Sequence, residues 1–164
     1  MFVAESVTGW FAKDLEKVTA APQQFTSHAV AAHRVYTKEN RHAVEVVAAQ
    51  EKHLVKWLSK RLGQKIKAPA LGGFGYELVG GRLLAPVENV PAVHFMYQNE
   101  KLNRLTLYVR RAEKSETTSF RFERKGSVTM FYWIDSPMAY ALIGEVPRAQ
   151  LLKISNKVYD QISR

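Results

Sequence analysis

Hydrophobic residues in the first part of the chain recur three and four positions apart, the spacing of one face of a helix. Stripes of this kind lie within residues 7–18, 25–36 and 49–62. Gly63 follows the third stripe and is well placed to end that helix. This part of the sequence therefore predicts three helices, with a short extended segment at 44–47 between the second and the third.

After residue 71 the spacing changes to short alternating runs, such as 93–97 and 105–109, which are typical of strands. Gly80-Gly81 predicts a two-residue hairpin turn. Residues 128–134 form an apolar run in which the side chains on both faces of a strand would be hydrophobic. We therefore expect a central strand covered on both faces. Pro147 is typical of a helix start and predicts a final helix.

The order of helices, then strands, then one helix predicts an α+β fold. We expect an antiparallel sheet of about six strands, with N-terminal helices and a C-terminal helix packed on it. With 164 residues, of which 46% are hydrophobic, the chain can bury one sizeable core and is expected to be a single structural unit.

Charge and cysteine content limit the possible functions. The chain has 24 Lys and Arg against 15 Asp and Glu, a formal net charge of +9, which favours anionic partners such as nucleic acid, lipid or an acidic protein. It has no cysteine, which excludes disulfides, thiol nucleophiles and cysteine-containing zinc sites. No stretch of about 18 apolar residues is present, so no transmembrane helix is predicted.

Histidines concentrate in the stretch HRVYTKENRH, residues 33–42. The five histidines of the chain show neither an HExxH motif nor a close His-x-His pair, so motif spacing favours ordinary packing and surface roles over a metal site. A minority hypothesis is that His33, His42 and Glu45 bind a metal ion or a proton. A hydrolase or isomerase would need His33 or His42 beside a carboxylate in a closed pocket.

Other catalytic patterns are absent from the sequence. The glycines of GGFGYELVGG precede a predicted strand instead of a helix and lack the spacing of a phosphate-binding loop. No serine lies in a G-x-S-x-G motif. We therefore predict no catalytic residue, no cofactor and no enzymatic activity.

Two regions are strongly basic. Residues 52–67 hold six Lys and Arg and no acid, and residues 101–125 hold eight against three. Lys52, Lys56 and Lys60 form a row on the third predicted helix that is suited to a membrane or partner face. If that row meets the membrane, it should share a side with the N-terminus. The Arg- and Tyr-rich strands leave open the alternative of a nucleic-acid-binding domain, although they lack the usual RNA-binding signature.

Five runs follow one another in an order that resembles a known family. They are HRVYTKENRHAVEV, EKHLVKWLSKRLG, YELVGGRLLAP, HFMYQNEKLNRLTLYVRR and FYWIDSPMAYALIGE. The chain resembles, from about residue 31 to its end, the extracytoplasmic domain of proteobacterial transmembrane anti-sigma factors, also called transmembrane transcriptional regulators.

The resemblance implies a location on the periplasmic side of the bacterial inner membrane. It implies a membrane-proximal helical segment at 1–43 and an α+β globular domain at 44–164. The implied partner is an extracytoplasmic-function sigma factor, bound through a cytoplasmic segment that is not in this sequence. A membrane surface or a periplasmic partner is a further expectation, and nucleic acid is the less favoured one.

The same resemblance suggests a role for HRVYTKENRH as the junction between the helical segment and the globular domain. His33, Arg34, Arg41 and His42 are expected to clamp this junction. Their expected partners are Glu39, Glu45 or the last carbonyls of the preceding helix. In such a regulator, a periplasmic change would bias two arrangements of the domain, or the domain would be cut by regulated proteolysis.

Overall fold

The computed structural model describes residues 24–39, 43–113 and 117–163. The chain is helical from residue 24 to residue 36. The later elements, in chain order, are β1 (Val46–Val47), the short helix η1 (Ala48–Gln50), α2 (Glu51–Leu62), the short helix η2 (Gly72–Phe74), β2 (Glu77–Val87), β3 (Val90–Gln98), β4 (Arg104–Arg111), β5 (Arg121–Lys125), β6 (Val128–Asp135), β7 (Met138–Gly144) and α3 (Arg148–Ile162).

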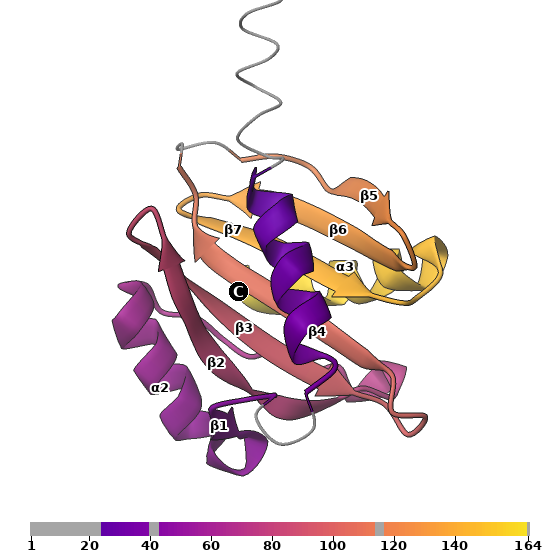
Figure 1. Cartoon of the computed structure of the whole chain (residues 1–164), viewed down its shortest axis with the longest axis horizontal. Coiled ribbons are helices and arrows are strands. Elements are labelled where there is room, and N and C mark those ends of the chain that lie inside the picture. Colours follow the sequence, from indigo (N-terminus) through magenta and orange to yellow (C-terminus); the bar gives the residue numbers. More distant parts are fainter. Residues whose placement is uncertain (1–23, 40–42, 114–116, 164) are drawn as a thin grey trace, which may run out of the picture.

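Within the described residues, seven strands form one sheet in the order β1-β2-β3-β4-β7-β6-β5. Every neighbouring pair is antiparallel. The chain runs through β1 to β4 in spatial order, crosses to the far edge at β5, and returns through β6 to place β7 beside β4 (Figure 1). The predicted α+β class is confirmed, with one strand more than expected.

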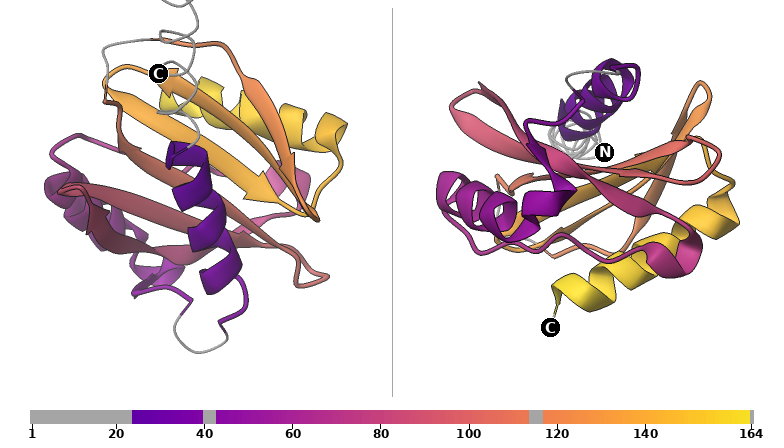
Figure 2. Two further views of the ribbon diagram at one scale, coloured as in Figure 1. Left: turned by 45° about the horizontal axis from the view of Figure 1, so that its top comes forward. Right: turned by 90° about the horizontal axis from the view of Figure 1, so that it is seen from below.

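Helices cover both faces of the sheet, so the domain has three layers (Figure 2). On one face, α2 and α3 bury Leu58, Leu151 and Ile154 against large residues of the strands, among them Phe95 and Trp133. On the other face lies the helix of residues 24–36, which contributes to a second, smaller core. The expected boundary at residue 43 thus falls between two parts that share a core.

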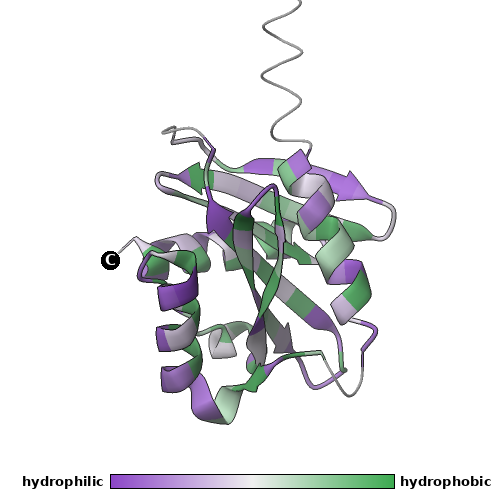
Figure 3. Cartoon of the chain, turned by 60° about the vertical axis from the view of Figure 1, so that its left-hand side comes forward, coloured by the Kyte–Doolittle hydropathy of each residue, from purple (hydrophilic) through white to green (hydrophobic). Residues whose placement is uncertain are grey.

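The helix α2 follows its sequence pattern closely. Leu54, Leu58 and Leu62 are buried against the sheet, and its other side carries hydrophilic residues (Figure 3). It ends at Gly63, whose φ of 72° lies in the left-handed region that glycine adopts without strain. The α3 helix likewise begins directly after Pro147, as predicted.

The predicted hairpin at Gly80-Gly81 is wrong, because β2 runs straight through both glycines. They are needed for close approach: a Cβ on Gly80 would lie 2.2 Å from the carbonyl oxygen of Val46 in β1. The turn lies instead at Glu88 and Asn89, whose φ angles of 52° and 64° suit a tight hairpin between β2 and β3.

Two further expectations concern the N-terminal part of the chain. The helix predicted within residues 7–18 lies outside the described residues, whereas the one predicted within 25–36 is confirmed. Among the helices of the described ranges, none combines the length and the apolar character that crossing a bilayer requires.

Candidate functional site

The helix of residues 24–36 lies across the sheet with its apolar side against β3, β4, β6 and β7. Phe25, Ala29 and Val30 are its buried apolar residues. The ring of Phe25 meets that of Tyr108 edge-on, with 5.5 Å between centroids. The strands contribute both small and large apolar residues below the helix, such as Ala141 in β7 and Met130 in β6.

His33 extends the contact with the sheet by a polar interaction. Its side chain is buried, and a hydrogen bond of 2.7 Å joins His33 Nδ1 to Thr106 Oγ1 in β4. Burial, with a smaller effect of the Arg34 guanidinium, lowers the pKa of His33 to about 4. The imidazole is therefore neutral at physiological pH.

His94 lies in the same interface, on the strand next to Thr106. It is 1% exposed, and neither ring nitrogen has a hydrogen-bond partner among the described residues. Burial is the main cause that lowers the pKa of His94 to about 3, and the neighbouring His33 and Arg82 add to the effect. His94 is a buried basic group whose protonation the surroundings oppose.

Tyr36 and Arg82 close this interface on the side of β2. The ring of Tyr36 lies 5.8 Å from that of His94, centroid to centroid. The guanidinium carbon of Arg82 lies 3.8 Å from the centroid of the Tyr36 ring, a favourable cation–π geometry. Arg82 Nε also donates a hydrogen bond of 3.2 Å to the carbonyl oxygen of Ala43. We use the name histidine junction for His33, Tyr36, Arg82, His94 and Thr106.

The C-terminal end of the helix is bound by an arginine of β4. Arg104 Nη1 donates to the carbonyl oxygens of Tyr36 at 3.4 Å, Thr37 at 3.1 Å and Glu39 at 2.6 Å. Carbonyls at a helix end lack partners within the helix and carry partial negative charge, so a cation stabilises them. The positive charge of Arg104 therefore holds this end of the helix in place on the sheet.

The residues expected to clamp the junction lie at two different places. His33 lies in the histidine junction, but Arg34 is exposed and its Nη2 donates to the carbonyl oxygen of Lys125 at 3.2 Å. Arg41 and His42 lie outside the described residues. The helix carbonyls that we expected these residues to bind are held by Arg104.

The described residues do not assemble the minority metal site. Glu45 Oε1 accepts a hydrogen bond of 2.8 Å from the backbone N–H of Leu83, and His33 is bonded to Thr106. In the described ranges no group of three His, Asp or Glu side chains is arranged to hold a metal ion. His42, the third member of the hypothesis, lies outside these ranges.

The lysine row of α2 lies where the sequence pattern puts it, but not where a membrane role requires it. Lys52, Lys56 and Lys60 are all exposed. However, α2 packs on the face of the sheet opposite to the helix of residues 24–36. The row therefore does not share a side with the described part of the N-terminal helix.

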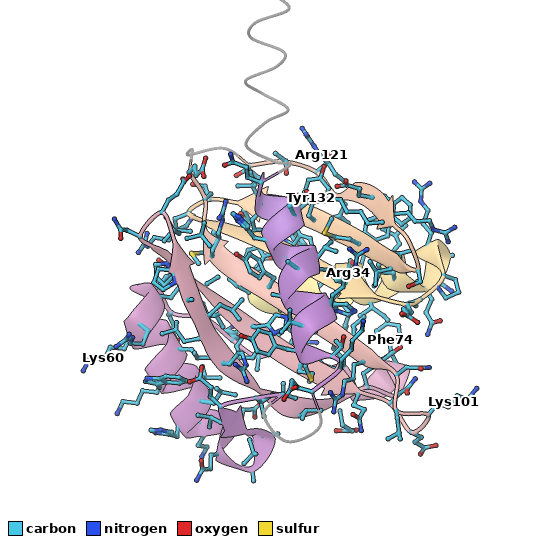
Figure 4. All side chains as sticks on the ribbon, in the orientation of Figure 1. Arg34, Lys60, Phe74, Lys101, Arg121 and Tyr132 are labelled. Carbon is cyan, nitrogen blue, oxygen red and sulfur yellow. The ribbon has the colours of Figure 1, made fainter. Side chains whose placement is uncertain are left out.

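The basic side chains of the described residues do not form one continuous face. Lys60, Lys101 and Arg121 project from different sides of the domain (Figure 4). Several arginines of the basic strands bind the protein itself: Arg104 binds the N-terminal helix, and Arg111 donates to the carbonyl oxygen of Gly63 at 2.6 Å. This distribution does not favour the nucleic-acid alternative.

Neither His33 nor His94 lines the pockets at residues 48–53, 64–67 or 72–77, and the first of these, an open pocket at the start of α2, is lined by both Glu51 and His53. A cavity of about 380 Å³ lies at the other face, between the end of α2 and the end of α3, and no histidine lines it. It is lined by Lys65, Asp135 and Tyr140 among others, and burial, assisted by Asp135, raises the pKa of Tyr140 to about 12. A phenol that holds its proton so firmly is poorly suited to act as a base at neutral pH.

Sequence reasoning missed most of the histidine junction. It placed His94 within the predicted strand at 93–97 but gave it no role. A histidine that alternates with apolar residues is typical of the solvent-facing side of a half-buried strand. Here both faces of β3 are buried, so His94 is in the core. The alternation of MYQNEKLNRLTLYVRR likewise gives no indication that Arg104 binds a helix more than 60 residues away in sequence.

No protein-family model matches this chain, and no curated protein matches it. The function must therefore be inferred from the sequence runs and the site itself.

Proposed function

We propose that this chain is the regulatory, non-catalytic domain of a membrane-bound anti-sigma factor, located on the periplasmic side of the inner membrane. The observation that carries the proposal is the docking of the helix of residues 24–36 on the sheet through the histidine junction and Arg104. The helix packs on the sheet by one apolar side, and polar contacts hold its C-terminal half; an element docked in this way can take two positions.

The position of the resembling runs supports the proposal. HRVYTKENRHAVEV extends from the docked helix to β1, so it connects the N-terminal part of the chain to the sheet. The other runs correspond to α2, to β2, to the β3–β4 pair and to the β6–β7 pair, which form the body of the domain. The most distinctive run thus coincides with the junction between two structural parts.

The mechanism follows from the direction of the chain. Residues 1–23 precede the docked helix in sequence and, in the proposed parent protein, a membrane helix and a sigma-binding segment precede them. A change in the docking of residues 24–36 would alter the path of the chain toward the membrane. The sigma factor would be released either by that change or by proteolysis that it permits.

The first test is made on the complete gene. We expect the codons upstream of Met1 to encode an apolar stretch of about 20 residues, and the complete product, purified from membranes, to carry a sigma factor. The chain alone, expressed from Met1, is the matched control and should bind no sigma factor.

The location can be tested in the same cells because the chain has no cysteine. Leu102 is 71% exposed, and Leu102→Cys should react in intact cells with a maleimide that cannot cross the inner membrane. The same variant expressed without the upstream codons is the control, and on this proposal it should stay unlabelled. A gene that begins at Met1, with no sigma factor bound and no labelling of residue 102, would overturn the proposal.

A further inference from the structure

The histidine junction buries two basic side chains without a counter-ion. Besides burial, Arg34 lowers the pKa of His33, and His33 and Arg82 lower the pKa of His94. The other titratable and charged groups at this interface are phenols, cations and one further histidine: His28, Arg34 and Tyr36 from the helix, Arg82 from β2, and Arg104, Tyr108 and Arg110 from β4.

The acidic residues near the junction have other partners or face away from it. Glu45 accepts the N–H of Leu83, and Glu113 forms an ion pair of 3.5 Å with Arg110. Glu39, which follows the helix, is exposed. A proton taken up by His94 would therefore be a buried charge without an anion and without a hydrogen-bond acceptor, which is strongly unfavourable.

Release of the helix is the simplest way to relieve such a charge. The helix covers His94 and carries His33 itself, so its removal gives both imidazoles access to water. The buried apolar side chains that it contributes are Phe25, Ala29 and Val30, which pack on strand residues such as Tyr108 and Met130. Among the described residues the buried histidines are His33 and His94, so the larger core on the opposite face does not share this sensitivity.

We propose that the helix of residues 24–36 is an acid-sensitive latch, which leaves the sheet when His33 and His94 take up protons. The structure thus assigns to His94 a role as the principal proton acceptor, and to the proton the role of the signal. As a signal for transcription this rests on the proposed function, whereas the release itself is a property of the domain.

The sign and size of the effect follow from linkage. In the docked state the pKa values are about 4 for His33 and about 3 for His94, against an ordinary value of about 6.5 in water. The released state therefore binds more protons below about pH 6.5, and docking weakens as the pH falls. At about pH 5 the docking equilibrium should fall by roughly 30-fold for each histidine.

Hydrogen exchange of backbone amides measures this equilibrium directly. The full chain is compared at about pH 7.5 and pH 5, with rates corrected for the intrinsic effect of pH. We expect the protection of residues 24–36 to fall by roughly 30-fold for each histidine and to become much lower than that of α3, which exchanges only when the domain unfolds.

Three variants identify the groups responsible. His94→Leu places an apolar side chain where no hydrogen bond is lost, and His33→Gln keeps a side chain that can bond Thr106. Each should remove roughly a 30-fold share of the pH effect. His53→Gln removes an exposed histidine from α2 and is the matched control, which should behave as the unchanged protein.

Each other outcome overturns the proposal. Unchanged protection of the helix at low pH, or an undiminished pH effect in both His94→Leu and His33→Gln, would show that these histidines do not control docking. Protection of α3 that falls to the same low level as that of residues 24–36 would show unfolding of the whole domain in place of helix release. Helix release without any bound sigma factor in the full-length protein would leave the latch in place and reject the proposed function instead.

Discussion

At the scale of single residues, the one hydrogen bond between His33 and Thr106 contributes substantially to the stability of the domain. Both side chains are buried, and the hydrogen bond of 2.7 Å satisfies an imidazole nitrogen that would otherwise be desolvated without a partner. A buried polar atom that loses its partner costs about 1–3 kcal/mol. The neighbouring His94 already lacks such a partner, so the junction has little tolerance for a second loss.

Thr106→Val should therefore destabilise the domain, because valine keeps the shape of threonine but removes the hydroxyl. We expect the free energy of unfolding, measured by urea denaturation, to fall by about 1–3 kcal/mol. Thr117→Val at an exposed position is the control, for which we expect a change within about 0.5 kcal/mol. Equal effects of the two substitutions would mean that the His33–Thr106 bond contributes no stability.

The individual residues of the junction show where sequence reasoning reached its limit. His33 stood out because it lies in a dense polar stretch at the end of a predicted helix. Its partner could not be found, because Thr106 is 73 residues away and lies in a strand whose inward face has no distinctive polar pattern. Pairing across a sheet depends on register, and a single sequence does not give register beyond local hairpins.

At the scale of elements, one strand fixes two helices on opposite faces of the sheet. Arg104 at the start of β4 binds the C-terminal carbonyls of the helix of residues 24–36. Arg111 at the end of β4 binds those of α2, with bonds of 3.3 Å to Leu62 and 2.6 Å to Gly63. Each helix thus has a positive charge from β4 at its negative end, and in α2 this charge adds to those of Lys60 and Arg61 in the last turn of the helix itself.

The two arginines allow a crossed experiment in which each variant is the control of the other. Arg104→Met should lower the protection of residues 24–36 against hydrogen exchange and leave α2 unchanged. Arg111→Met should do the opposite. We expect each local effect to correspond to about 1–2 kcal/mol, the value of a charged hydrogen bond at a helix end. If both variants loosened both helices alike, the arginines would be acting on the sheet and not as caps.

Elements with a strong local sequence pattern were predicted correctly. Elements whose conformation depends on contacts with residues distant in sequence were not. Gly63 and Pro147 mark α2 and α3 through their own backbone preferences. Gly80-Gly81 carries the same kind of local signal for a turn, but β1 and the α2 side chain Leu54 approach these glycines so closely that they serve packing instead. The true turn at Glu88 and Asn89 is a less typical sequence for its conformation.

At the scale of the whole molecule, the two neutral histidines make stability depend on pH. Their pKa values in the folded protein are lower than in the unfolded chain, so the unfolded chain binds more protons once the pH falls below about 6.5. The stabilisation associated with the neutral junction is complete above that pH and is lost progressively toward pH 4.

The free energy of unfolding should accordingly fall by about 2 kcal/mol per buried histidine between about pH 7 and pH 5. Urea denaturation across this range measures the slope, and His94→Leu should reduce it by about half. Stability that rises as the pH falls, or a slope that is unaffected by His94→Leu, would contradict the burial of a neutral His94.

The distance between the helix of residues 24–36 and the sheet, measured as a function of pH, tests the release of this helix most directly. The absence of cysteine allows spin labels at Val35→Cys, on the helix, and Leu102→Cys, between β3 and β4, both at exposed positions. The pair Val87→Cys and Leu102→Cys, both outside the helix, is the reference. We predict one narrow distance distribution for each pair at about pH 7.5, and a second, longer and broader population for the helix pair alone at about pH 5, which His94→Leu suppresses. A helix distance that stays single and narrow on acidification, or a reference distance that broadens with it, would contradict the account.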